Sequence, residues 1–247
     1  MNVVSIVRST TRWVELQTKL FRKFCGVDVI YVNHGPNHDA MQRDFDLLGV
    51  PAHRIPEFAD NNPSMSHSFA LEWVAREYLR NRDDDLCIVD MDIFPTRPTS
   101  LASFLDGYHA AGQVVMPTPR HWHLWPGLLL ISRDAPKRKE IKLGACRLLN
   151  HHDAPESERW VWLDSGGESL LWIADTQPTI NILEGRSFSD SDLPSELAGN
   201  YDDRYVFEVK NESFFHLHGA TNWMGLPAEL HEARERLAER YLNGLVE

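Results

Sequence analysis

The chain has 247 residues, of which 43% are hydrophobic and 25% charged, as in ordinary folded globular domains. Acidic residues outnumber basic ones by 36 to 25, giving a formal net charge of -11. Because a nucleic-acid binder needs a basic face to neutralise phosphates, we expect no nucleic acid as a partner. No apolar run approaches the roughly 20 residues that cross a bilayer, and the first residues do not form a signal peptide. Cys25, Cys87 and Cys146 are too widely spaced for a metal motif, so we expect core thiols in a reducing compartment. Together these features predict no transmembrane segment and a protein that is cytoplasmic, or else a soluble virion or phage product.

The first 95 residues alternate between apolar strand patterns and amphipathic helix patterns. They predict strands at 3–7, 27–35 and 85–92, and helices at 10–24, 38–48 and 64–81. Thr10 or Thr11 is expected to cap the first helix, and Gly49 to end the second. This alternation is typical of βαβ units and predicts an α/β fold with a mainly parallel central sheet flanked by helices. Ligands of such sheets bind at the carboxyl ends of the strands.

The second half is less regular. It predicts strands at 113–118 and 125–133, a helix over 136–150, and an extended segment that passes into a helix near Ser165. A strand at 179–183, a long polar loop at 187–205, a strand from 213 and a helix from about 227 follow. We expect Trp160, Trp162 and Trp172 in the core. With no repeat or linker, residues 1–247 are expected to form a single domain.

Two pairs of side chains are candidate metal ligands. The stretch "IVDMDIFP" places Asp90 and Asp92 two residues apart at the end of an apolar strand, so both point to one side if the strand stays extended. His216 and His218 repeat that spacing in "FFHLHG". Carboxylates suit Mg2+ or Mn2+, and a neutral imidazole can complete such a site. The plainer explanations are acids at an exposed strand tip and hydrogen-bonded core histidines.

These motifs together resemble a known family. Strand–helix alternation from residue 3, then "IVDMDIFP", then "HLHGATNW", looks like a glycosyltransferase of the GT-A fold, a Rossmann-like nucleotide-diphospho-sugar transferase domain. The spacing of His216, Gly219 and Trp223 is similar to the ending of the glycogenin-like retaining enzymes. The family's lysine in that ending is not present, since Thr221 and Asn222 stand in its region, which leaves a phosphate contact unassigned.

The resemblance implies a nucleotide-binding half at 1–95 and an acceptor-binding half at 96–247. It implies Mn2+ or Mg2+ as the cofactor, a UDP- or GDP-linked sugar as the donor, and a glycan or other hydroxyl compound as the acceptor. The ion would be bound by Asp92, by His216 or His218, and by Asp90 unless that residue binds the ribose. The other donor-binding residues would be Arg8, Ser9, Thr10 and Asn33, with His67 or Ser66 opposite them on the helix before the Asp-x-Asp strand.

Two further stretches are candidates for the acceptor side. In "WLDSGGES", Asp164 or Glu168 would lie beside the acceptor, as the base of an inverting enzyme or a positioning group of a retaining one. The alternative for Asp164 is a helix cap. In "RHWHLWPG", aromatic faces can stack on sugars and imidazoles can bind hydroxyls, although loop and core packing is also expected of them. These acceptor candidates are His121, Trp122, His123 and Trp125.

Two other functions fit parts of the same pattern. A haloacid-dehalogenase-like phosphatase also carries Asp-x-Asp at a strand end, with the first Asp as nucleophile and Mg2+ beside it. In that family Thr or Val should stand two residues after the second Asp, where this chain has Phe94, and the motif should open the domain. A GT-A-like module that binds a nucleotide-sugar without turnover is the non-enzymatic alternative.

Overall fold

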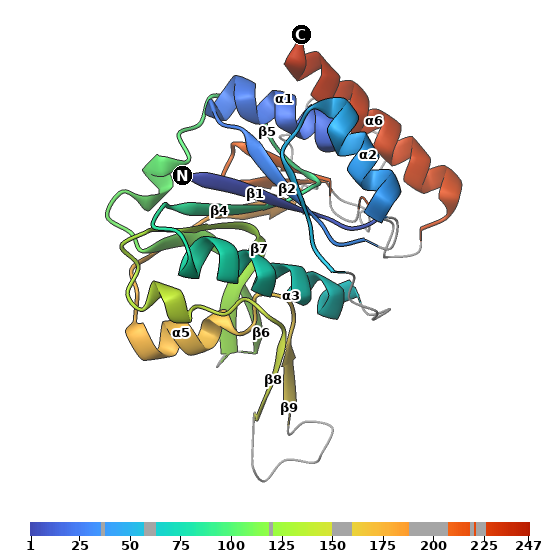
Figure 1. Cartoon of the computed structure of the whole chain (residues 1–247). Helices are drawn as coiled ribbons and strands as arrows, with labels where there is room; N and C mark the ends of the chain where they lie inside the picture. Colours follow the sequence, from blue (N-terminus) through green and yellow to red (C-terminus); the bar gives the residue numbers. More distant parts are fainter. Residues whose placement is uncertain are drawn as a thin grey trace.

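The computed structural model describes residues 1–35, 38–56, 63–118, 121–149, 160–187, 207–217, 220 and 226–247. Strands and helices alternate through the first part of the chain, as the sequence predicts (Figure 1). The elements are β1 (Asn2–Val7), α1 (Val14–Cys25), β2 (Val29–Asn33), α2 (His38–Leu48), β3 (Ala52–Arg54), α3 (Pro63–Val74), the π-helical turn η1 (Ala75–Arg80) and β4 (Leu86–Asp90).

The central sheet has seven strands in the order β10-β6-β7-β4-β1-β2-β3, in which β6 is Ala110–Thr118, β7 is His121–Ile131 and β10 is Ile180–Ile182. The pairs β4–β1, β1–β2, β2–β3 and β10–β6 are parallel, and β7 runs antiparallel to both its neighbours. The predicted α/β class with a mainly parallel sheet is therefore confirmed.

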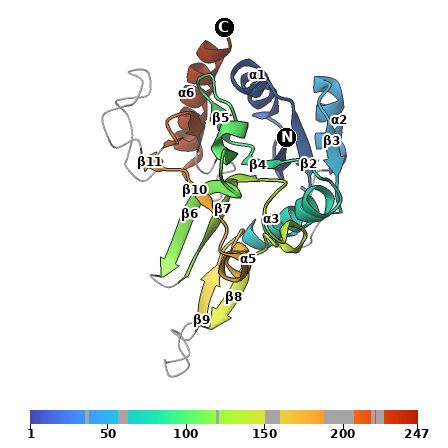
Figure 2. The same ribbon diagram turned by 90° about the vertical axis from the view of Figure 1, so that its left-hand side faces the viewer.

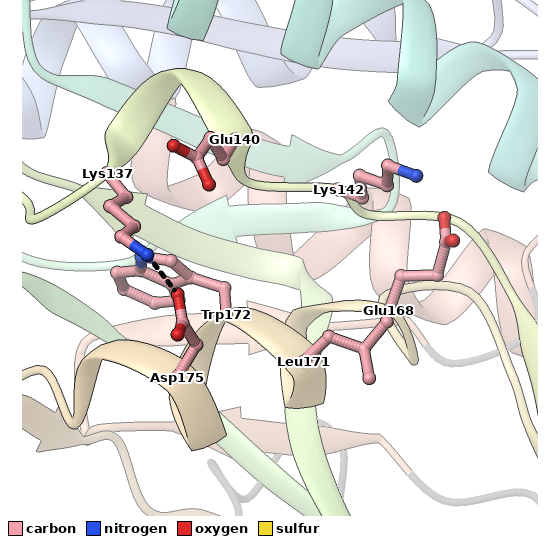
Figure 3. Close-up of a pocket in the computed structure, with 7 residues that line it drawn as sticks. All are labelled: Lys137, Glu140, Lys142, Glu168, Leu171, Trp172 and Asp175. Atoms are coloured by element: carbon pink, nitrogen blue, oxygen red, sulfur yellow. Dashed lines mark hydrogen bonds and ion pairs between the residues drawn. The ribbon is translucent and has the colours of Figure 1, made fainter.

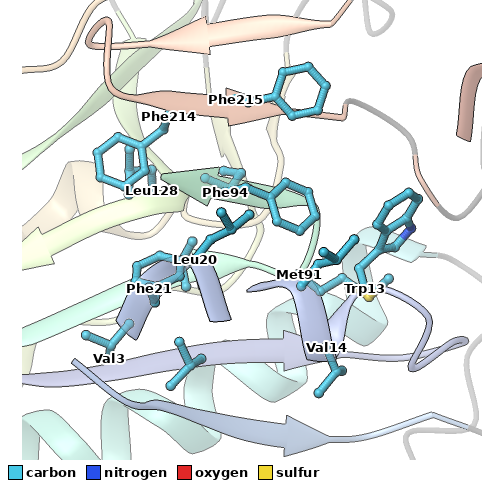
Figure 4. Close-up of a cluster of buried hydrophobic side chains, with 14 of the residues drawn as sticks. Val3, Trp13, Val14, Leu20, Phe21, Met91, Phe94, Leu128, Phe214 and Phe215 are labelled. Atoms are coloured by element: carbon cyan, nitrogen blue, oxygen red, sulfur yellow. The ribbon is translucent and has the colours of Figure 1, made fainter. Parts of the chain in front are cut away.

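Helices cover both faces of this sheet (Figure 1). On one face α1, α2 and α6 (Ala228–Val246) enclose the larger core cluster, part of which is shown in Figure 4. Trp13, Phe21, Phe94, Phe214 and Phe215 are among its aromatic side chains. On the other face α3, η1 and α5 (Ser169–Thr176) bury a second cluster. Burial on both faces explains why the central strands are almost wholly apolar.

Two smaller sheets stand beside the central one. The first has the order β11-β12-β13-β5, from Gly185–Ser187, Glu208–Lys210, Phe214–His216 and Ile93–Pro95. The second is a ribbon of β8 (Cys146–Leu149) and β9 (Trp160–Leu163), which extends away from the body of the molecule in both Figure 1 and Figure 2.

The expected helix over 136–150 is wrong. A short 3-10 turn, η3 (Arg138–Glu140), is followed by β8 instead. The guanidinium of Arg138 is buried and donates to the carbonyls of Tyr78 and Leu79 in η1 and of Arg82 and Asp84 after it. Those long-range acceptors, together with the pairing of β8 with β9, outweigh the local helical pattern.

Other local expectations also need correction. The helix α1 begins after Trp13 and has no side-chain cap, because Thr10 accepts from the N–H of Arg12 and Thr11 donates to Asp44. The polar, aromatic link at 120–124 is part of β7 from His121 onward, and α5 begins at Ser169 rather than near Ser165. The end of α2 at Leu48 and the start of α6 at Ala228 agree with the prediction, and Gly49 adopts φ +64° after α2.

The tryptophans differ in burial. Trp172 is buried as expected, with its indole N–H donating to the carbonyl of Pro136. Trp160 and Trp162 are 39% and 49% exposed, so their expected place in the core is wrong. They lie on the β8–β9 ribbon, outside the two core clusters. In the part of the chain that the structure describes, no helix is long and apolar enough to cross a membrane.

Candidate functional site

The carboxyl ends of three adjacent parallel strands place Arg8, Asn33 and Asp90, which are candidate residues for binding the sugar donor, at one edge of the sheet. In the sheet register Ile6 of β1 lies beside Asp90 of β4, and Val7 lies beside Asn33 of β2. Arg8 follows β1 at the same edge. The loops after β1 and β2 touch there, because a Cβ atom on Gly35 would lie 1.5 Å from the carbonyl oxygen of Arg8. This position therefore requires glycine.

The two aspartates do not continue one extended strand, and that expectation is wrong. Asp90 ends β4, Met91 and Asp92 form a turn, and Ile93 begins β5. The turn is held by the buried amide of Gln17 on α1, which donates to the carbonyl of Asp90 at 2.8 Å and to that of Ile93 at 2.9 Å. The turn lets the chain pass from the central sheet to the smaller one.

That passage brings a histidine from the far end of the chain to Asp92. β5 pairs with β13, with Ile93 opposite His216. The Nε2 atom of His216 then lies 3.6 Å from Oδ1 of Asp92, with the two side chains only 4% and 13% exposed. The backbone N–H groups of Leu217 and Ala220 donate to the carbonyl and to Oδ2 of Asp92. His218 lies outside the described residues.

The environment of Asp92 disfavours its charged form. The pKa of Asp92 is raised to about 6, chiefly by burial and to a smaller extent by the carboxylate of Asp90, while His216 acts in the opposite direction. A buried carboxylate with a second carboxylate beside it is stabilised when a cation enters between or next to them. A cation bound at this site would therefore stabilise the charged form of Asp92.

Asp90 has a histidine partner of its own. Nε2 of His67 on α3 lies 3.5 Å from Oδ1 of Asp90, and Nδ1 of His67 is 3.3 Å from the hydroxyl oxygen of Ser165. Ser66, the neighbouring candidate, is buried and faces Nδ1 of His34 instead, at 3.4 Å. The structure thus brings His67 to Asp90 and leaves Ser66 buried beside His34.

The strand β7 closes the other side of Asp90. A Cβ atom on Gly127 would lie 2.6 Å from Oδ2 of Asp90 and 2.1 Å from the ring of Trp125, so only glycine fits there. The ring of Trp125 packs on His216 at 5.2 Å between centroids, and the ammonium of Lys210 lies 4.6 Å from the same indole. Trp125 therefore belongs to the wall of the site.

The remaining acceptor candidates are not gathered into one platform. Trp122 packs with the second core cluster, whereas Trp125 packs with the first. His123 is buried, and burial lowers its pKa although Asp164 acts to raise it. The imidazole of His121 contacts the hydroxyl of Thr118. Their roles toward an acceptor stay predictions.

The two candidate catalytic acids lie in different places. Asp164 is exposed, and its Oδ1 accepts from the N–H of Ser165, so it caps this turn rather than the helix α5. Glu168 packs against Gly144, and burial, followed by the charge of Glu72, raises its pKa. Figure 3 shows Glu168 in a pocket of about 270 Å³. The other residues lining that pocket are Lys137, Glu140, Lys142, Leu171, Trp172 and Asp175.

Of the remaining candidates for binding the sugar donor, Ser9 is exposed, and the hydroxyl of Thr10 accepts a hydrogen bond from the backbone N–H of Arg12.

Sequence reasoning missed Gln17, Ser165 and Gly127. Gly127 and Ser165 stand in the quoted stretches "WPG" and "LDSGG", so glycine and serine beside polar aromatic segments were an available signal. Nothing in the sequence pattern of α1 points to Gln17, because its contact lies 73 residues away.

The side-chain atoms at this site are of the types that bind a divalent cation. Carboxylate oxygens and a neutral imidazole nitrogen are ligands that Mn2+ and Mg2+ accept. Two ligands each about 2.1 Å from one ion lie at most about 4.2 Å apart, a limit that the 3.6 Å between Asp92 and His216 meets. Across the described ranges, no group of three or more His, Cys, Asp or Glu side chains is arranged to hold a metal ion. A bound ion would need further ligands from its substrate.

Comparison with known proteins finds no family model and no curated protein that matches the chain. Among solved structures, the glycosyltransferase GlyE of Streptococcus pneumoniae TIGR4 has a TM-score of 0.38 and 13% identity over 74% of this chain and 45% of that one. This chain thus spans less than half the length of the GlyE chain.

Two further structures show the same range of likeness. A putative glucose-1-phosphate thymidylyltransferase from Bacillus anthracis, in complex with a sucrose, has a TM-score of 0.33 and 10% identity over 54% of this chain and 72% of that one. Mouse xyloside xylosyltransferase 1 has 0.32 and 7%, over 56% and 70%. Such scores assign neither a family nor an activity, so the function must come from the residues of the site.

Proposed function

We propose that this chain is a metal-dependent glycosyltransferase that moves a sugar from a UDP- or GDP-linked donor to a hydroxyl group of a glycan or related acceptor. The observation that carries the proposal is the pairing of Asp92 with buried His216, next to Asp90, at the carboxyl edge of β1, β2 and β4. This is the edge at which α/β sheets bind nucleotides.

The residues of the edge divide between the ion and the donor. Asp92 and His216 would hold Mn2+ or Mg2+, which supplies Lewis-acid stabilisation of the leaving diphosphate when bound. Asp90 would take the ion or a ribose hydroxyl, with His67 orienting its carboxylate. Arg8 and Asn33 would contact the nucleotide, since their strands end beside β4.

The acceptor would approach from the side of Asp164 and Trp125. Asp164 is exposed, and Ser165 next to it contacts His67, so this turn joins the donor edge to open solvent. In an inverting enzyme Asp164 would take the proton of the acceptor hydroxyl, and in a retaining one it would orient the acceptor. The anomeric configuration of the product, read by NMR, decides between these two roles.

The experiment is a thermal-shift and turnover assay with UDP- and GDP-sugars, with and without Mn2+. A ligand at about 100 times its Kd stabilises the folded state by about 2.7 kcal/mol, which for a chain of this size raises Tm by about 5–10 °C. We expect a shift that requires both nucleotide and metal in the wild type, absent in Asp92→Asn and in His216→Gln. Asp134→Asn, a change at an exposed acid, is the matched control.

Three results would contradict the proposal. Stabilisation by nucleotide in the absence of metal would remove the assigned roles of Asp92 and His216. Hydrolysis of an aryl phosphate that is lost in Asp90→Asn, with no response to any nucleotide, would indicate the phosphatase. Metal-dependent nucleotide binding without sugar transfer or donor hydrolysis would indicate a binding module.

A further inference from the structure

The β8–β9 ribbon carries two tryptophans on its outer face. Trp160 and Trp162 are two residues apart on β9, so their side chains point to the same side. Arg147 lies opposite Trp162 in the register, and its guanidinium stacks on the ring of Trp160 at 4.9 Å from the centroid. This outer face, formed by Arg147, Trp160 and Trp162, is called the ribbon face below.

The side chains on the opposite side of the ribbon are apolar and buried or partly buried, as expected for a side that packs on the protein. Leu163 is buried, and Val161 and Leu148 are partly buried. In a strand with one covered side, the exposed positions are normally polar. Here those positions hold tryptophan, and the side chains of Trp160 and Trp162 remain 39% and 49% exposed. Packing of the ribbon therefore accounts for the inner residues and not for the two indoles.

We propose that the ribbon face is a carbohydrate-binding platform that holds the acceptor glycan. This deepens the proposed function, on which it rests for the word acceptor. Flat indole faces stack on the C–H surfaces of sugar rings, and two of them along a strand suit consecutive rings of an oligosaccharide. The guanidinium of Arg147 adds donors for hydroxyl or carboxylate groups.

The strand that carries the two indoles leads directly to the candidate site. β9 leads through Asp164 to Ser165, whose hydroxyl contacts His67, and His67 faces Asp90. At about 3.3 Å per residue, Trp162 lies within about 10 Å of Ser165 along the chain, and Trp160 within about 17 Å. An oligosaccharide lying on the two indoles can therefore extend one end toward Asp164 and the donor edge.

Other occupants fit the ribbon face less well. A second copy of the chain would need about 800 Å² per partner for a stable interface. Two indoles at about 150–250 Å² each, already partly covered, provide well below that area. A membrane surface would have to attract a chain of net charge -11 through this face, whose one cation is Arg147 among the three residues that define it.

The test is a glycan array of neutral and uronate-containing oligosaccharides, probed with the wild type and three variants. Trp162→Ala should bind the glycans that the wild type retains about tenfold more weakly, which is near the upper limit of the free energy expected for one aromatic contact. Trp162→Leu keeps an apolar side chain without a ring and should lose as much, whereas Trp162→Tyr should retain most of the binding. Leu47→Ala, at a residue 86% exposed on α2, is the matched control.

Donor hydrolysis separates this proposal from the proposed function. With water as acceptor, Trp162→Ala should hydrolyse the nucleotide-sugar at the wild-type rate, with only KM for the glycan raised. If the wild type binds glycans through the ribbon face but no nucleotide, the transferase proposal fails and the platform stands. No retained glycan, equal binding by wild type and Trp162→Ala, or binding to phospholipid vesicles or self-association lost in Trp162→Ala would each overturn the platform.

Discussion

Replacing Asp92 with asparagine should abolish donor binding and at the same time stabilise the metal-free protein. Burial raises the pKa of Asp92 from 3.8 to about 6, a change of about 2 pKa units, and each unit corresponds to about 1.36 kcal/mol. Holding the charged carboxylate in the folded state therefore costs about 3 kcal/mol at pH 8. Asparagine keeps an oxygen that can accept from the N–H of Ala220 and removes the charge.

The pH dependence follows from the direction of this shift. The folded protein binds the proton of Asp92 more tightly than the unfolded chain does, so the stability contributed by this group is complete below pH 3.8. It is lost as the pH rises through about 6. Asp92→Asn should thus raise the free energy of unfolding by about 1–3 kcal/mol at pH 8, and by about half as much at pH 5.

Urea unfolding in EDTA, at pH 5 and pH 8, measures the effect. Asp134→Asn should show no such difference between the two pH values, because that side chain is exposed. If Asp92→Asn is destabilised equally at both pH values, then burial does not penalise the charged form of Asp92. The argument that the site is prepared for a cation would then be refuted.

Two other substitutions test the contacts around Asp90 and Asp92, and a third tests the buried guanidinium of Arg138. Gly127→Ala should lower stability by about 1–3 kcal/mol and reduce donor turnover, because its methyl group would lie 2.1 Å from the ring of Trp125; unchanged turnover would show that β7 does not shape the site. Gln17→Leu should cost about 1–3 kcal/mol in urea unfolding, since two carbonyls of the β4–β5 turn lose their donor, and an unchanged midpoint would contradict this. Arg138→Met should cost more than about 3 kcal/mol, because it leaves four carbonyls without their donor; a smaller loss by thermal unfolding would mean that water replaces the guanidinium.

The periodicity of apolar residues was sufficient to predict those helices and strands whose own residues specify them. The alternation of apolar segments gave β1, α2, β4 and the helical segment formed by α3 and η1 near their observed bounds, although η1 is π-helical. Gly49 ends α2 in the left-handed conformation that glycine adopts readily. The position of Asp90 at a strand end, and hence at the binding edge of a parallel sheet, follows from the same pattern.

Choices between neighbouring side chains required the folded chain. Successive residues of a helix point about 100° apart, so the sequence could not decide whether Ser66 or His67 faces the aspartates. Packing of α3 on the sheet turns His67 to Asp90 and Ser66 to His34. In the same way, the exposure of Trp160 and Trp162 is decided by how far the β8–β9 ribbon extends from the body.

By itself, then, the sequence determined the α/β class, the order of the early elements and the edge at which we propose that a ligand binds, because these follow from the local pattern of apolar and polar residues. The tertiary structure alone decided that Asp92 leaves β4 in a turn and meets His216, more than a hundred residues away. That meeting depends on pairing between β5 and β13 and on the buried amide of Gln17. Long-range strand pairing is selected by the packing of the whole core, and the residues of either strand alone do not carry it.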